Sequence, residues 1–205
     1  MNIAVFASGR GSNFEAILKA IDSGLLPVRV VLLLSNRSDA GALDLARSRG
    51  IPVLHLSRRQ CSSDEDFARR MLAALEEHHA EFIALAGYLK RIPPSVLERY
   101  ANRIVNIHPA LLPFFGGDGM YGHFVHEAVL ASGMKISGAT VHLVDEEYDH
   151  GAILFQKSVE IEQGETAETL AQKVLNVEHE IFPLVLKAFA EGKVVIEGKK
   201  AWVIL

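Results

Sequence analysis

Residues 2–21 read NIAVFASGRGSNFEAILKAI, and this stretch predicts the fold of the chain. Residues 3–7 form an apolar run that is typical of a buried strand. A glycine loop follows, and apolar residues then recur at helical spacing from Phe14 to Ile21, ahead of a stop at Gly24. A strand, a loop and a helix in this order form the first unit of an alternating α/β fold.

The same alternation continues through the first half of the chain. The predicted strands are 3–7, 28–34, 53–56, 82–86 and 104–107, and the predicted helices between them are 14–21, 40–49, 64–79 and 94–100. Because the run 28–34 is apolar throughout, we expect its strand to be covered on both faces. The order predicts a doubly wound, mostly parallel sheet.

The second half of the chain changes character and predicts an antiparallel C-terminal extension. A glycine-rich loop precedes a short helix, two strands flank a turn, and a long helix containing Pro183 leads to a final hairpin around Gly198. We expect Pro183 to kink or split the long helix, because proline cannot donate a backbone hydrogen bond. These predicted elements are the helix 126–132, the strands 136–144 and 153–161, the helix 166–190, and the hairpin strands 194–196 and 201–205.

Composition excludes several classes of protein. Apolar residues make up 49% of the 205, which is enough for a buried core. The balance of 21 basic and 25 acidic residues argues against a protein that binds nucleic-acid phosphates. Cys61 is alone, so no intrachain disulfide is expected. The longest apolar run, 30–34, is too short to cross a membrane, and residue 3 already begins a strand pattern, so we expect a cytoplasmic protein with no membrane partner.

The loop Ser8–Asn13 has the features of an anion-binding site. Its glycines allow a ligand to approach the backbone, and the following helix offers free N–H groups and the positive end of its dipole. Position 14 is Phe rather than the third glycine of a dinucleotide fingerprint, and the Walker A pattern is absent. The loop therefore favours a phosphate monoester over NAD or ATP. An ordinary strand-to-helix turn without a ligand remains the alternative.

A second polar cluster follows the predicted strand 104–107. Ligands of open α/β sheets bind beyond the carboxyl ends of the strands. Asn106 and His108 point the same way in an extended chain, and they combine an amide donor with a group that titrates near neutral pH. Asp149 is a candidate partner that would favour the protonated imidazole. The alternatives are that Asn106 caps a turn, His108 packs beneath the loop and Asp149 belongs to a solvated acidic turn.

Several motifs together resemble one family. They are Ser8–Asn13, Ala86–Tyr88, Asn106–Pro113, Thr140–His142, the turn Asp145–Gly151, and Glu178 with His179. Asn-x-His-Pro-x-Leu-Leu-Pro is similar to the motif of folate formyltransferases and their hydrolase relatives. The glycine loop resembles that of the phosphoribosylglycinamide formyltransferase family, which acts in purine synthesis. The resemblance implies a formyltransferase-like Rossmann variant that forms a single domain, 1–205, with a phosphate-binding half, 1–110, and a folate-side half, 111–205.

The resemblance also implies a role for individual residues. The catalytic residues would be Asn106, His108 and Asp149, with His142 beside them. The residues that bind the substrate, glycinamide ribonucleotide, would be Gly11, Ser12, Asn13, Leu175, Asn176, Val177 and Glu178. The residues that bind the co-substrate, 10-formyltetrahydrofolate, would be Leu89, Lys90, Arg91, Ile92, Asn106, Asp145, Glu146, Glu147, Tyr148 and Asp149. No metal is implied, and the protein would be a monomer or a homodimer. His123, His126 and Glu127 share metal-ligand spacing, but a surface helix explains them better.

Two alternative functions differ from formyl transfer to an amine. A formyltetrahydrofolate hydrolase shares the Asn-His-Asp set and uses water as the acceptor. Its family has an additional N-terminal domain, whereas the strand pattern here begins at residue 3. A non-catalytic nucleotide-binding module would explain the glycine loop but not the polar cluster around His108.

Overall fold

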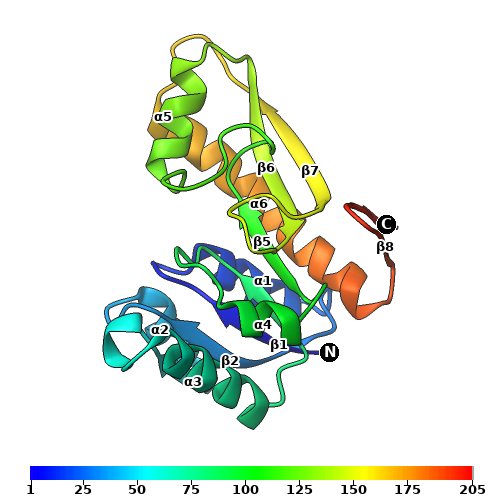
Figure 1. The fold of residues 1–205 in the computed structure, drawn as a ribbon. Coiled ribbons are helices and arrows are strands. Elements are labelled where there is room, and N and C mark those ends of the chain that lie inside the picture. The colour runs from blue at the N-terminus through cyan, green and yellow to red at the C-terminus, as the bar shows by residue number, and fades with distance from the viewer. Residues whose placement is uncertain (205) are drawn as a thin grey trace. The chain divides into compact units, whose positions relative to one another are not determined.

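The first half of the chain forms a five-stranded parallel arrangement in the computed structural model, which describes residues 1–204 (Figure 1). Parallel pairing joins β1 to β2 and β4, β2 to β3, and β4 to β5. The strands are β1 (Asn2–Phe6), β2 (Arg29–Ser35), β3 (Val53–His55), β4 (Phe82–Leu85) and β5 (Ile104–His108). The strand order β3-β2-β1-β4-β5 reverses direction after β3, as expected for a doubly wound sheet.

The strand order also determines which face of the sheet each helix of this half covers. They are α1 (Ser12–Asp22), α2 (Gly41–Ser48), the short 3-10 helix η1 (Arg58–Gln60), α3 (Asp64–Glu77) and α4 (Pro94–Arg99). A right-handed crossover places its helix on one face of the sheet when the next strand is added on one side, and on the other face when the next strand is added on the other side. In agreement, α1 contacts α2, and α3 contacts α4.

The second half contains an antiparallel hairpin covered by a long helix. Strand β6 pairs antiparallel with β7, and α6 packs against both strands and against α5. Strands β8 and β9 form a separate antiparallel pair. The elements are α5 (His123–Ala131), β6 (Ile136–Leu143), β7 (Ile153–Glu160), α6 (Ala167–Ala190), β8 (Val194–Glu197) and β9 (Lys200–Val203). The full sheet order is β3-β2-β1-β4-β5-β6-β7, which confirms the predicted fold class.

The chain divides into two compact units, Met1–Asn106 and Ile107–Leu205. Fully buried apolar residues of β1 and β2 form the core of the first unit. Buried residues of α6, including Ile181, Phe182 and Leu186, form much of the core of the second. Among residues 1–204, no helix has the length and apolar character needed to cross a bilayer.

Some predicted element boundaries were wrong. Helix α5 begins at His123 rather than at 126. Helix α6 continues from Ala167 to Ala190 with Pro183 inside it, so proline does not split the helix. The packing of buried residues on both sides of Pro183 explains why the helix persists despite one lost backbone donor. The predicted last strand extended to Leu205, which lies outside the described residues.

Close packing between β6 and β7 makes Gly138 sensitive to substitution. A Cβ atom at Gly138 would lie 2.2 Å from the Lys157 carbonyl oxygen and 2.8 Å from Leu111 Cδ2. We expect Gly138→Ala to lower the free energy of unfolding by about 1–3 kcal/mol, because two neighbouring groups must move. Urea unfolding measures this loss. Gly9→Ala is the matched control, since nothing lies within 4 Å of its Cβ position. Equal stability of the two variants would contradict the packing described for β6 and β7.

Candidate active site

The glycine loop leaves the first turn of α1 without a side-chain cap. Gly11 caps the helix with φ 89°, and no side chain forms a capping hydrogen bond there. A Cβ at Gly11 would lie 2.8 Å from Ala42 Cβ, so both the backbone conformation and the packing require glycine. Ser12 is half-buried and Asn13 is buried. This arrangement places backbone N–H groups and short polar side chains together at a helix N-terminus, where anions are stabilised.

Ser8 connects the glycine loop to the segment that follows β4. Its backbone N–H donates to the Gly87 carbonyl at 3.0 Å. Its hydroxyl accepts from the Leu89 N–H at 2.9 Å and donates to Asn36 Oδ1. The structure thereby brings together the start of the predicted phosphate loop and the start of the predicted folate-binding segment 89–92.

The predicted folate-binding segment, residues 89–92, is mostly open to solvent. Leu89 is 42% exposed, whereas Ile92 is only 6% exposed. Lys90 and Arg91 are both exposed. One apolar side chain of the segment is therefore available at the surface, and another anchors the segment in the core.

The end of β5 carries Asn106 and His108. Asn106 is half-buried and His108 is 3% exposed. The chain that follows β5 is held by Thr140 on β6, whose hydroxyl donates to the Ala110 carbonyl at 2.6 Å and accepts from the Leu112 N–H at 3.1 Å. These bonds fix the direction in which the chain leaves β5.

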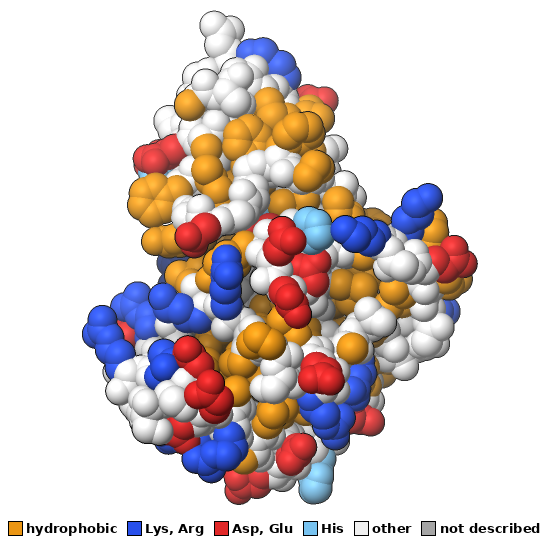
Figure 2. Space-filling model, in the orientation of Figure 1, with side chains coloured by type: hydrophobic (Ala, Val, Ile, Leu, Met, Phe, Trp, Pro, Cys, Tyr) orange, Lys and Arg blue, Asp and Glu red, His pale blue; other side chains and the backbone are white. Residues whose placement is uncertain are grey.

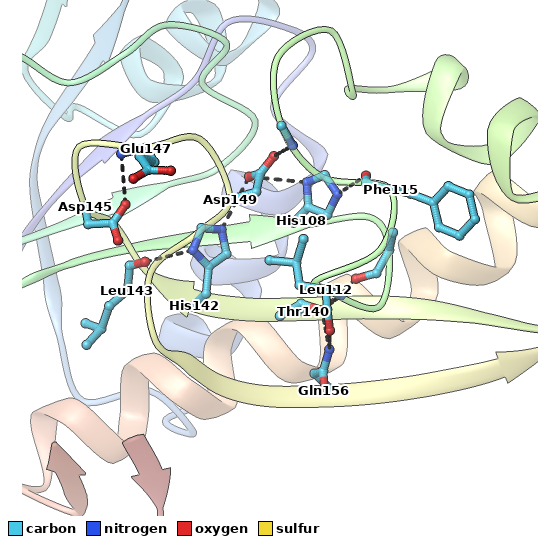
Figure 3. Close-up of polar contacts among 12 residues, drawn as sticks. His108, Leu112, Phe115, Thr140, His142, Leu143, Asp145, Glu147, Asp149 and Gln156 are labelled. Carbon is cyan, nitrogen blue, oxygen red and sulfur yellow. Dashed lines mark hydrogen bonds and ion pairs between the residues drawn. The ribbon is translucent and has the colours of Figure 1, made fainter. Parts of the chain in front are cut away.

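Asp149 lies between two buried imidazole rings (Figure 3). Its Oδ1 is 3.5 Å from His108 Nδ1 and 3.5 Å from His142 Nε2. Its Oδ2 accepts from the backbone N–H of Gly117 at 2.9 Å. Asp149 has φ 55°, a left-handed conformation that aspartate tolerates better than most residues. The structure thus brings together three of the predicted site residues from β5, β6 and the loop between β6 and β7.

On each ring, the nitrogen that faces away from Asp149 lies next to a backbone carbonyl. His108 Nε2 lies 2.8 Å from the Phe115 carbonyl oxygen. His142 Nδ1 lies 2.8 Å from the Leu143 carbonyl oxygen. Each imidazole is therefore held at both nitrogens, once by a carbonyl and once by the carboxylate of Asp149 (Figure 3).

Burial and charge act in opposite directions on His108 and Asp149. Burial lowers the pKa of His108 below its ordinary value of 6.5 and outweighs the charge of Asp149 and the Phe115 carbonyl, which both raise it. Asp149 thus favours the protonated ring, as predicted, but the net shift of the pKa is downward. Burial raises the pKa of Asp149, but the hydrogen bond from His142, the charge of His108 and the N–H of Gly117 together hold it below 3.8.

The remainder of the Asp145–Asp149 turn is partly exposed, with Asp145 and Tyr148 half-buried. Asp145 accepts from the backbone N–H of Glu147 at 3.0 Å and pairs with His150 at 2.8 Å. Glu146 and Glu147 are exposed, and Figure 2 shows acidic side chains and a histidine over this loop. Asp149, at the end of this turn, contacts both His108 and His142.

Residues 175–178, which were predicted to bind the substrate, form one turn of α6. Glu178 is 7% exposed and Val177 is buried. Leu175 is half-buried, and Asn176 is exposed and accepts from Gln172 at 3.2 Å. This turn therefore combines a buried carboxylate with an exposed amide.

Sequence reasoning missed the backbone groups that complete the site. These are the carbonyls of Phe115 and Leu143 and the N–H of Gly117. No side-chain pattern identifies such groups, although the glycine cluster after Pro113 signals an unusual backbone. His126 was expected on a surface helix but is 4% exposed, and burial lowers its pKa to about 4. No group of three potential metal ligands occurs within residues 1–204.

We expect Asp149→Asn to lower the pKa of His108 by about one unit or more, because an opposite charge close to the ring is removed while its shape is kept. Direct NMR titration of His108 measures the shift. Asp145→Asn is the matched control, since Asp145 pairs with the exposed His150 in the same turn. An unchanged His108 titration in Asp149→Asn would show that the two side chains are not coupled.

Comparison with known proteins is consistent with this geometry. Residues 1–186 match the family model described as formyl transferase. A chloroplastic phosphoribosylglycinamide formyltransferase of Arabidopsis thaliana is 45% identical over 94% of this chain, which spans 66% of that protein's length. A protein of that name from Bacillus subtilis (strain 168) is 37% identical over 90% of this chain and 92% of its own.

A solved structure shows the same arrangement of elements. The glycinamide ribonucleotide transformylase 1 of Symbiobacterium toebii superimposes with a TM-score of 0.93 at 36% identity, over 100% of this chain and 94% of its own. The family model covers most of the chain, residues 1–186. The chain belongs to the formyl transferase family.

Proposed function

We propose that the protein transfers the formyl group of 10-formyltetrahydrofolate to the amine of glycinamide ribonucleotide, a step of purine biosynthesis. The single observation that carries the proposal is the buried pairing of His108 with Asp149 at the end of β5. Relatives named phosphoribosylglycinamide formyltransferase, in Bacillus subtilis and Escherichia coli among others, support the choice of substrates.

The site residues supply the electrostatics that acyl transfer requires. As the amine attacks the formyl carbon, negative charge grows on the formyl oxygen. Asn106 and His108 donate hydrogen bonds to that oxygen, and Asp149 keeps the imidazole aligned and favours its charged form. Loss of one such donor typically slows the reaction by about a hundredfold or more. None of these steps calls for a metal.

His108 must change its hydrogen-bond partner to act in this way. Its Nε2 faces the Phe115 carbonyl, and its Nδ1 faces Asp149. In the proposed reaction the formyl oxygen takes the place of the Phe115 carbonyl at Nε2, while the contact with Asp149 is kept. The glycine-rich segment after Pro113 then has to release its contact with the ring.

The two substrates are assigned to the remaining predicted residues. We assign the substrate phosphate to Gly11, Ser12 and Asn13, where α1 lacks a side-chain cap. The ribose is assigned to residues 175–178, with Glu178 as its polar contact. The folate is assigned to residues 89–92 and to the turn 145–149, with Asn106 beside its formyl group.

The setting of the reaction is also part of the proposal. We assign the protein to the cytoplasm, with two small molecules as its substrates and no nucleic-acid or membrane partner, as a monomer or a homodimer. The net charge of -4 supports the exclusion of nucleic acid. The relative from Arabidopsis thaliana is chloroplastic by its name, so the compartment differs among relatives.

The decisive assay follows release of the deformylated folate. The protein is incubated with 10-formyltetrahydrofolate, with and without glycinamide ribonucleotide. We expect release only when the amine is present, and a loss of about a hundredfold or more in His108→Ala. Equal turnover without the amine would identify a hydrolase, and no turnover in either mixture would favour a non-catalytic binding protein.

We expect Ser12→Asp to weaken binding of the phosphate substrate by at least about tenfold and to leave folate binding nearly unchanged. The added carboxylate would face the phosphate at the start of α1, where like charges repel. Calorimetric titration of each ligand measures the two affinities. Ser12→Asn is the matched control, because it has the same shape without the charge. Equal losses for both ligands would contradict the assignment of this loop.

A further inference from the structure

On each of the two imidazoles beside Asp149, the nitrogen that faces away from the carboxylate carries a hydrogen. A backbone carbonyl only accepts hydrogen bonds, so the nitrogen that faces it must carry a hydrogen. His108 therefore carries a hydrogen on Nε2, 2.8 Å from the Phe115 carbonyl oxygen. His142 carries one on Nδ1, 2.8 Å from the Leu143 carbonyl oxygen. The two remaining nitrogens, His108 Nδ1 and His142 Nε2, face the same oxygen of Asp149 at 3.5 Å each.

This arrangement favours one additional proton on the pair of rings. If both rings were neutral, each would direct a lone pair at an ionised carboxylate, which is repulsive. If both rings were charged, two cations would lie against one anion in a site where the side chains of His108 and His142 are 4% and 3% exposed. Burial lowers the pKa of His108, and a charge on His142 lowers it further. One proton on the pair gives Asp149 a charged donor from one ring at a time and avoids two adjacent cations.

We propose that His108 and His142 share a single proton through Asp149 Oδ1, and that His142 holds it whenever His108 is neutral. This role for His142 rests on the proposed function, because it serves the proton transfers of formyl transfer. In that reaction the C–N bond to the amine forms and the C–N bond to the folate breaks. The amine nitrogen loses one proton and the folate nitrogen gains one, so the pair has the same number of protons before and after.

The relay explains how a buried His108 can act as a donor. Passage of the shared proton from His142 Nε2 to Asp149, and from Asp149 to His108 Nδ1, charges His108 without bringing a proton from solvent. His108 Nε2–H then donates more strongly. His142 remains neutral with its hydrogen on Nδ1, where the Leu143 carbonyl holds it. His142 is thus a positioning residue that acts through Asp149.

The charge of His108 also acts on a third imidazole, that of His126. His126 on α5 lies within charge-interaction range of His108, and its own neighbour is His123. Burial, with smaller contributions from His123 and His108, lowers the pKa of His126 to about 4. His126 is therefore neutral near pH 7 and does not compete for the shared proton there.

Long-range 1H–15N correlation spectra of the unliganded protein test the proposal between pH 5 and 9. We expect the His108 ring to show two titration steps separated by about one pH unit or more, as for coupled groups. In His142→Gln, residue 142 keeps an N–H donor near Asp149 but cannot titrate. We therefore expect the His108 ring to show a single titration step, at a pH above that of the lower of its two wild-type steps. A His108 titration that is the same in both proteins would overturn the proposal.

Two further measurements separate proton sharing from a purely structural role. His150→Gln is the control, since His150 is exposed and paired with Asp145, and it should leave the His108 titration unchanged. If His142→Gln does not fold, the wild-type spectra still decide, because a His142 with hydrogen on Nε2 and none on Nδ1 would overturn the proposal. These spectra need no substrate, so their outcome is independent of whether the protein transfers formyl groups.

Discussion

The carboxylate of Asp149, held between two buried imidazoles, is the interaction on which the site depends. Oδ1 faces His108 and His142, and Oδ2 is fixed by the N–H of Gly117. Two rings from different strands are therefore oriented by one side chain. The ionised form of Asp149 is favoured in the folded protein, since its pKa lies below 3.8. It therefore stabilises the fold above the ordinary pKa of aspartate, and this contribution is lost as the pH falls through the lowered value.

The fold supplies this interaction through three neighbouring segments. Strand β5 ends at His108, β6 carries His142 close to its own end, and the loop between β6 and β7 returns Asp149 to both. The loop can do so because Asp149 adopts a left-handed conformation, which also occurs at Phe115 on the opposite side of His108. Such conformations cost free energy in non-glycine residues and are typical of functional sites. The close approach of Gly116 to Asp149, where a Cβ would lie 3.0 Å from Asp149 Cβ, adds a steric constraint.

The sequence predicted those parts of the protein that side chains determine. Apolar runs identified the strands, and the strand order followed from the alternation with helices. The spacing of Asn106 and His108 on one strand predicted a polar cluster at the end of that strand. The pairing of Asp149 with His108 was a hypothesis at that stage, because residues more than forty positions apart carry no local signal, and the structure shows the contact.

The remaining features depend on the backbone and on burial. The carbonyls of Phe115 and Leu143 determine where the imidazole protons lie, and no residue pattern encodes a carbonyl direction. The sign of the His108 shift was also beyond the sequence, because burial, which exceeds the effect of Asp149, appears only in the folded chain. Pro183 shows the same limit, since tertiary packing keeps α6 continuous against a strong local preference.

The central claim is that Asp149 is an ionised carboxylate that organises both rings, and its own titration tests this most directly. Carbon-13 NMR of the Asp149 carboxyl group, followed while the pH is lowered in the unliganded protein, gives its pKa in the folded state. The account predicts a midpoint below the ordinary value of 3.8, because the hydrogen bond from His142, the charge of His108 and the N–H of Gly117 outweigh burial. A midpoint at or above 3.8 would mean that burial dominates and that the carboxylate is not the centre of the site.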